Sequence, residues 1–166
     1  MAITPDQILL YYPEQTDGDL WGGGPTTQTI PQSKNAIFDD VTGDEAATGD
    51  TEYRKVFVGI DSSAGSQALS NVYVWISVET PGDDTLFLKT RNSADDSNYY
   101  SDIPAYTGNG YPTAAWKHCT NRDDGIFLGT ITTDSPKGVW ICRWVPPECS
   151  AYANNSAVLR IEGETA

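Results

Sequence analysis

Strict alternation of apolar and polar residues is the feature that most limits what this chain can fold into. In SNVYVWISVE, residues 70–79, four aliphatic side chains occupy every second position. Successive side chains of a β-strand point to opposite faces of its sheet, so this spacing places all four on one face. KGVWICRWV and YRKVFVGI, residues 137–145 and 53–60, show the same alternation. Shorter segments of this kind lie at residues 85–91, 125–131 and 157–163.

The segments between these expected strands are rich in turn-forming residues. DSSAGSQ, ETPGDD and TTDSPKG combine Gly, Pro, Asp and Ser, which favour tight turns. Helical periodicity is nearly absent, and the best candidate is TPDQILLYY, where Thr4 is placed to cap one turn. Short strands joined by turns, without intervening helices, are typical of sandwiches and small barrels. We therefore predict an all-β fold, a single antiparallel β-sandwich of the jelly-roll or immunoglobulin-like type.

Two segments interrupt the rhythm of strands and turns. Residues 13–36 are rich in Gly, Pro and polar side chains and are expected to form an extended arm. Residues 92–124 are too long for an ordinary loop, yet their four tyrosines and one tryptophan argue against disorder. We expect a packed excursion with a short strand around AAWKHC, residues 114–119. The predicted organisation is an extended N-terminal arm at residues 1–37 and one sandwich domain at residues 38–166.

The acidic composition argues against several classes of partner. Ten basic residues stand against twenty-three acidic ones, giving a formal charge of -13. Nucleic acid and anionic lipid both require a basic surface, so neither is an expected partner. The first fifteen residues lack the basic region of a usual secretory signal, and no apolar run is long enough to span a membrane.

The three cysteines are expected to be reduced thiols. Cys119, Cys142 and Cys149 form no C-x-x-C pair, and their number is odd. Together with the lack of a secretion signal, this predicts a protein made in the cytoplasm. A disulfide between Cys142 and Cys149 across a turn is the alternative.

An acidic run precedes the strand expected at residues 53–60. It contains Asp39, Asp40, Asp44, Glu45, Asp50 and Glu52. Asp40 and Asp44 have the alternating spacing of a calcium-binding loop, but Gly43 and the closing position do not fit the EF-hand pattern. We favour a turn-forming approach to the strand, with a calcium site at the Asp40/Asp44 loop as the alternative. Arg54 is placed to anchor one of the carboxylates, because an arginine can hold a carboxylate through two bonds.

No motif in the sequence has the geometry that catalysis requires. His118 is the only histidine and adjoins Cys119, but neighbours on an extended chain point to opposite faces. Paired carboxylates can cleave glycosidic bonds at a set separation, but a chain with so many acids contains such pairs by chance. We therefore expect a protein that is not an enzyme and that holds no cofactor.

The aromatic residues fall into two groups. Trp75, Trp140 and Trp144 lie on expected strands and are assigned to the core. The others are candidates for a protein interface, where aromatic side chains are enriched. These interface candidates are Trp21, Tyr99, Tyr100, Tyr106, Tyr111 and Trp116. Exposed rings can also stack on sugars, so a carbohydrate-binding module for host surface glycans is an alternative of another class.

The order of several motifs resembles a known family. The chain runs through WGGGPTTQTI, NAIFDDVTGDEAATGDTEYRKVFV, LSNVYVWISVETPGDDTLFL and KGVWICRWVPPECSAYANNSAVLRIEGET. Over residues 22–165 this order resembles small virion structural or tail proteins of tailed bacteriophages. The resemblance implies a non-enzymatic virion subunit, made in the bacterial host cytoplasm and present as a homo-oligomer or in many copies. It implies other virion proteins, tail or capsid subunits, as partners; the tail is favoured, and decoration of the capsid exterior is the alternative.

Overall fold

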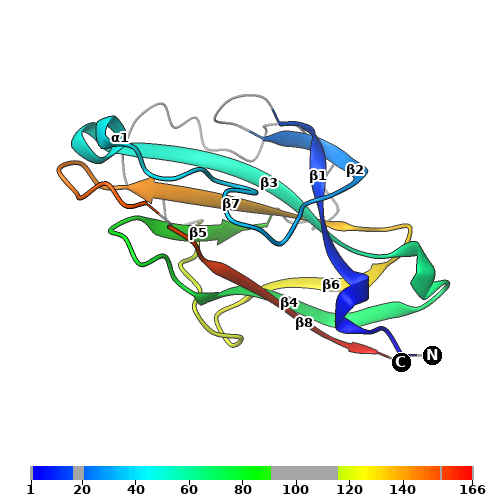
Figure 1. Ribbon diagram of the computed structural model, residues 1–166. Helices are drawn as coiled ribbons and strands as arrows, with labels where there is room; N and C mark the ends of the chain where they lie inside the picture. The colour runs from blue at the N-terminus through cyan, green and yellow to red at the C-terminus, as the bar shows by residue number, and fades with distance from the viewer. Residues whose placement is uncertain (1, 17–20, 91–115, 154, 166) are drawn as a thin grey trace.

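Two antiparallel β-sheets pack face to face in the computed structural model (Figure 1). The structure describes residues 2–16, 21–90, 116–153 and 155–165. The larger sheet has five strands in the order β2-β1-β3-β7-β5, and the smaller has three in the order β6-β4-β8. The strands are β1 (Ile8–Gln15), β2 (Gly22–Thr29), β3 (Asp50–Ile60), β4 (Ala68–Val78), β5 (Thr85–Lys89), β6 (Ile126–Thr132), β7 (Lys137–Val145) and β8 (Val158–Thr165). The predicted all-β sandwich is confirmed, and the six strands expected from alternation correspond to β3 through β8.

The N-terminal segment belongs to the larger sheet. β1 pairs antiparallel with β3 from Ile8, opposite Ile60, to Tyr11, opposite Phe57, and β2 pairs with β1. This corrects the expectation of an extended arm at residues 1–37. Proline lacks the N–H that a ladder needs, but Pro13 lies where the register shifts and β2 lies at the sheet edge, where proline is tolerated.

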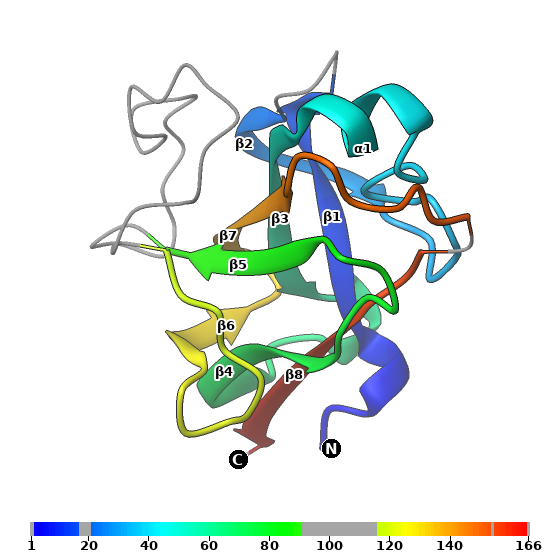
Figure 2. The ribbon, with the colours of Figure 1, turned by 90° about the vertical axis from the view of Figure 1, so that its left-hand side faces the viewer.

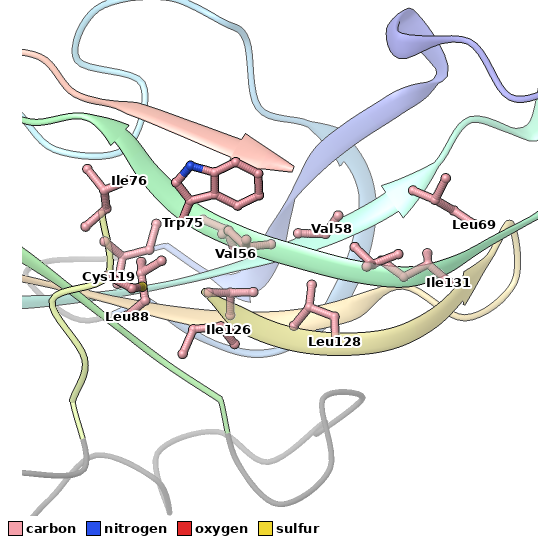
Figure 3. Close-up of a cluster of buried hydrophobic side chains, with 14 of the residues drawn as sticks. Val56, Val58, Leu69, Trp75, Ile76, Leu88, Cys119, Ile126, Leu128 and Ile131 are labelled. Carbon is pink, nitrogen blue, oxygen red and sulfur yellow. The ribbon is translucent and has the colours of Figure 1, made fainter. Parts of the chain in front are cut away.

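The core lies between the two sheets and is built from the alternating positions. Val56 and Val58 of β3 and Ile141 of β7 are almost fully buried, and so are Val74 and Ile76 of β4. Figure 3 shows part of this cluster between the strands. Burying one such side chain stabilises the fold by roughly 1.5–3 kcal/mol.

The strand tryptophans are placed largely as expected. Trp75 and Trp140 are buried, and Trp144 is partly buried. Trp75 packs against the core, whereas Trp140 and Trp144 belong to a second aromatic cluster that lies on the outer face of the larger sheet. Their assignment to buried positions therefore holds, although two different clusters bury them.

A short helix, α1 (Gly43–Thr48), forms within the acidic run. The Glu45 N–H donates to Thr42 Oγ1 at 3.3 Å, and the Thr42 N–H donates to the Glu45 carboxylate at 2.6 Å. This reciprocal arrangement is a capping box, and it satisfies two N–H groups at the start of the helix. The run is therefore more than a turn leading into β3. The T-x-x-E spacing was the sequence signal for this helix.

The remaining helical elements are single turns. Two 3₁₀ turns, η1 (Pro5–Gln7) and η2 (Ser62–Ala64), flank the paired ends of β1 and β3, and η1 follows Thr4 as expected. Within the described ranges, no helix is long and apolar enough to cross a membrane. The excursion expected at residues 92–124 lies largely outside the described residues. Of the strand expected near residues 114–119, Lys117 forms an isolated antiparallel bridge with Leu88.

Candidate interaction cleft

A cleft of about 780 Å³ opens between the sheets beside β8. Its walls are the start of β1, the segment at residues 30–39 and residues 155–161, which lead into β8. Figure 2 shows β8 at the edge of the smaller sheet, next to the N-terminal part of β1. The lining is mainly apolar and includes Leu10, Ile30, Leu86, Ile141, Leu159 and Ile161. A volume of this size is in the range of ligand-binding clefts, about 300–1,000 Å³.

The cleft also has a buried carboxylate in its lining, that of Asp84. Only 6% of this residue is exposed, and its Oδ1 accepts a hydrogen bond from the Asn155 amide at 2.6 Å. Asn155 is itself buried, and its own oxygen accepts from the Gly82 N–H at 3.3 Å. The other carboxylate oxygen, Oδ2 of Asp84, is buried without a hydrogen-bond partner. Asp84 is thus held in one orientation with half of its accepting capacity unused.

A cluster of buried charges lies on the inner face of the larger sheet. Arg54 Nη2 donates to Glu52 Oε1 at 2.7 Å, and Arg143 Nε donates to Glu52 Oε2, also at 2.7 Å. Arg143 also donates to the backbone carbonyl of Asp39 and lies 3.2 Å from its carboxylate. Arg54 therefore holds the last carboxylate of the acidic run, the kind of contact expected from the sequence.

The role of Arg143 was not recognised from the sequence. Its signal was present, because Arg143 occupies an inner-face position of KGVWICRWV between Ile141 and Val145. A charged residue on an apolar face requires a buried partner, and Glu52 pairs directly opposite Arg143 on β3. Burial raises the pKa of the Glu52 carboxyl above its ordinary value, while the charges of Arg143 and Arg54 act in the opposite direction.

Aromatic rings enclose the two guanidinium groups. The ring centroid of Phe38 lies 5.3 Å from Arg54 Cζ and 5.0 Å from Arg143 Cζ. Trp21, an interface candidate, lies 5.4 Å from Arg54 Cζ and 5.5 Å from the ring of Tyr12. The half-buried Trp21 therefore covers the charge cluster.

Carboxylates of the acidic run approach one another away from Asp40 and Asp44, the two residues of the alternative calcium site. Oxygens of Asp39, Glu45 and Glu52 lie within 4.8 Å of one another. Both oxygens of Glu52 already accept hydrogen bonds from arginines, which supply the positive charge that a cation would bring. Asp40 pairs with Lys34 at 3.1 Å, and Asp44 lies in the first turn of α1.

The other interface candidates divide between buried and undescribed positions. Trp116 is buried, with its ring 5.4 Å from that of Tyr53, in the cluster on the outer face of the larger sheet that also contains Phe87 and Trp140. The candidates that lie outside the described residues are Tyr99, Tyr100, Tyr106 and Tyr111.

Exposed aromatic and arginine side chains gather instead on the outer face of the smaller sheet. Tyr73 and Phe127 are cross-strand partners with ring centroids 5.1 Å apart, and Phe127 is 54% exposed. Arg122 Cζ lies 4.5 Å from the Tyr73 ring, and Arg122 Nε lies 3.0 Å from the Glu162 carboxylate. Arg160 lies over the buried Trp75. We name the exposed and partly exposed set the outer patch: Tyr73, Arg122, Phe127, Arg160 and Glu162. The sequence feature that indicates this patch is the alternation in residues 70–79, which places Tyr73 and Trp75 on the strand face opposite to the aliphatic residues.

The histidine and the cysteines occupy separate surroundings. His118 Nε2 lies 2.5 Å from Glu79 Oε1 at the surface, whereas Cys119 is buried in the core. Cys142 and Cys149 are both free thiols, as is Cys119. Burial raises the pKa of Cys119, and it raises the pKa of Cys142 to about 12.

The cleft and the outer patch are surfaces suited to binding. The cleft offers apolar walls with one partly unsatisfied carboxylate, and the outer patch offers a sheet face with aromatic rings and arginines. Comparison of the chain with protein-family models, with curated proteins and with solved structures finds no match in any of the three.

Proposed function

We propose that the protein is a non-enzymatic structural subunit of a tailed-bacteriophage virion, attached to the tail region through protein–protein contacts. The observation that carries the proposal is the outer patch. Interfaces are enriched in aromatic residues and arginine, and Tyr, Trp and Arg dominate their binding energy. The outer patch has this composition and leaves Phe127 more than half exposed.

The arginines of the outer patch are ordered before any partner arrives. Arg122 stacks on Tyr73 and pairs with Glu162, while Arg160 lies 5.7 Å from the ring of Trp75. Ordering a free arginine at an interface costs roughly 0.5–1.5 kcal/mol of side-chain entropy. Holding the side chains in place beforehand reduces that cost and favours a defined contact.

The virion and tail parts of the proposal rest on the motif order described above. A rigid sandwich with an acidic surface suits a subunit present in many copies, because its charge keeps it soluble before assembly. On a symmetric particle each copy needs only modest affinity, since many linked contacts act together.

Cryo-electron microscopy of intact particles tests the proposal. We expect density matching the sandwich on the tail, with the outer patch against a neighbouring subunit. Density on the head exterior would replace the tail assignment with capsid decoration. Absence of the protein from purified particles would refute the virion proposal, and a glycan-binding screen would then test the carbohydrate-binding alternative.

A matched pair of variants tests the outer patch itself. Phe127→Asp should abolish incorporation into particles while the isolated protein stays folded, because Phe127 is largely exposed. Thr27→Asp, an equally acidic change at an exposed position of β2, should leave incorporation intact. Equal incorporation of both variants would show that the outer patch is not the contact.

A further inference from the structure

The smaller sheet ends at β8 with an unused edge. β8 pairs with β4 on one side, and within the described ranges no backbone hydrogen bond joins its other side to another segment. The smaller sheet has three strands against five in the larger, and the cleft runs along the β8 edge between residues 155 and 161. The cleft therefore occupies the place where a fourth strand of the smaller sheet would lie.

The part of β8 beside the cleft lacks the features that protect sheet edges. Exposed edges are commonly guarded by charged side chains or proline. β8 carries charges at Arg160, Glu162 and Glu164, whereas its first two residues, Val158 and Leu159, and the two residues before them are uncharged. Val158, in the unguarded part, is 50% exposed. This edge is open to pairing with an extended segment.

The charge at the cleft calls for a basic side chain. Asp84 immediately precedes β5 and lies on the same face as Leu86. Because Leu86 pairs opposite Arg143, Asp84 lies near the buried charge cluster. The guanidinium groups of that cluster already pair with Glu52 and Asp39. Asp84 lines the same cleft as Arg143 but bonds the neutral Asn155 amide instead. Among the ion pairs of the described residues none involves Asp84, and its buried Oδ2 has no hydrogen-bond partner. Burying an unpaired charge is costly, so a positive group from outside would complete the site.

We propose that an extended segment of a neighbouring subunit adds a fourth strand to the smaller sheet along β8 and places a lysine or arginine side chain against Asp84. Main-chain hydrogen bonds to β8 supply the affinity, and the apolar walls and Asp84 select the side chains. This inference rests on the proposed function, because it names the kind of contact that the subunit makes in its assembly.

A strand attached to the protein itself tests the inference without knowledge of the partner. The full chain is extended at its C-terminus by an Asn-Gly turn and a strand of alternating Thr and Val, with one Lys near its far end, opposite residues 156–157. The Asn-Gly turn favours a hairpin, and the attachment gives the strand a high effective concentration at β8. Two control extensions carry Met in place of Lys, or Pro at alternate strand positions, which removes the N–H groups needed for pairing.

Amide hydrogen exchange and urea unfolding give the readouts. With the Lys extension we expect the backbone amides of the added strand and of β8 to exchange about tenfold more slowly than with the Pro extension. The Lys extension should also stabilise the protein more than the Met extension. This difference in stability between the Lys and Met extensions should vanish when Asp84→Asn is introduced. It should persist in the matched control Asp83→Asn, because the Asp83 carboxylate accepts a hydrogen bond from the Ser150 N–H and belongs to a different contact.

Each result counts for or against the inference. Equal exchange with the Lys and Pro extensions would refute strand addition, and a Lys–Met difference that survives Asp84→Asn would refute the role of Asp84. The test uses isolated protein, so its failure is separable from failure of the proposed function. If the protein is found on particles but the added strand does not pair with β8, only the inference is refuted and the proposed function stands.

Discussion

The inner face of the larger sheet has two regions that differ in what covers them. In one region, Val56 and Val58 of β3 and Val139 of β7 lie beneath the smaller sheet in an apolar core. In the other, further along the same strands and on the same face, Glu52 and Arg143 lie beneath the chain segment at residues 37–39. We call these the sheet-covered region and the loop-covered region.

The difference follows from the hydrogen-bonding needs of the cover. In the smaller sheet β4 is paired on both sides, by β6 and β8, so apolar side chains are enough to pack against it. The segment at residues 37–39 brings partly buried carbonyls without strand partners, and arginines supply donors to them. Arg54 donates to the Ile37 carbonyl at 3.3 Å, and Arg143 donates to that of Asp39. The segment at residues 37–39 is thus held over the sheet by hydrogen bonds from the buried arginine side chains.

Breaking the loop-covered region should have the largest effect. Arg143→Met keeps much of the side-chain volume but leaves Glu52 short of one partner and the Asp39 carbonyl without its donor. Removing one member of a buried ion pair typically costs about 3–5 kcal/mol, and we expect a loss of this size in the free energy of unfolding. Urea unfolding followed by circular dichroism measures it.

The matched control is Arg160→Met, at a side chain that is 62% exposed. Surface ion pairs contribute about 0–1 kcal/mol, so the control should change stability little. A loss for Arg143→Met as small as that of the control would show that the buried cluster does not hold the loop.

A smaller loss is expected from the helix that follows the loop. Thr42→Ala removes the hydroxyl that accepts from the Glu45 N–H, and losing an N-cap of this kind costs about 0.5–2 kcal/mol. Thr42→Ser keeps the hydroxyl and should restore most of the stability. If serine and alanine were equally destabilising, the methyl group and not the cap would be responsible.

The sheet-covered region should tolerate a small change better than the loop-covered one. Ile76→Val removes one methylene from the apolar cover and should cost about 0.5–1.5 kcal/mol. Ile76 of β4 lies in the apolar core and Arg143 of β7 lies in the buried charge cluster, so the double variant should show additive losses in urea unfolding. Strong coupling between the two would mean that the two regions interact energetically in the folded protein.

The sequence predicts the sheet-covered region much better than the loop-covered one. Each strand from β3 to β8 presents apolar side chains to the core, and this produces the alternation from which all six were predicted. β1 and β2 lack it: GGGPTTQT has no aliphatic residue, and its strand conformation comes from pairing with β1. α1 is too short for helical periodicity, although its capping box was visible.

The candidate site depends on contacts that lie far apart in the chain. Arg54 and Glu52 are two residues apart on one strand face, so their pairing could be anticipated. Arg143 reaches Glu52 across 91 residues, and only the pairing of β3 with β7 brings them together. The cleft depends likewise on which strand ends the smaller sheet. Local patterns do not specify long-range strand order, so neither the cleft nor its edge could be predicted.

The free cysteines allow the two regions to be compared within one molecule, because each thiol reacts only when its own surroundings open. Cys149 is partly buried in the loop-covered part, where it packs beside Val41 and Val145 and its N–H donates to the Ala46 carbonyl at 3.0 Å. Cys119 is buried in the sheet-covered core, and burial raises the pKa of Cys142 to about 12, so its reactive thiolate is scarce at pH 8.

With an aromatic disulfide reagent at pH 8, we therefore expect Cys149 to react first and the other two to react only on unfolding. Burial and the charge of Asp83 raise the pKa of Cys149, so its rate should rise with pH as the thiolate fraction grows. Ile76→Val should accelerate Cys119 by destabilising the core that buries it while leaving Cys149 unchanged, as peptide mapping of the labelled protein would show. Equal acceleration of both thiols would mean that the loop opens only when the whole sandwich unfolds, and that the two covers differ in chemistry but not in local stability.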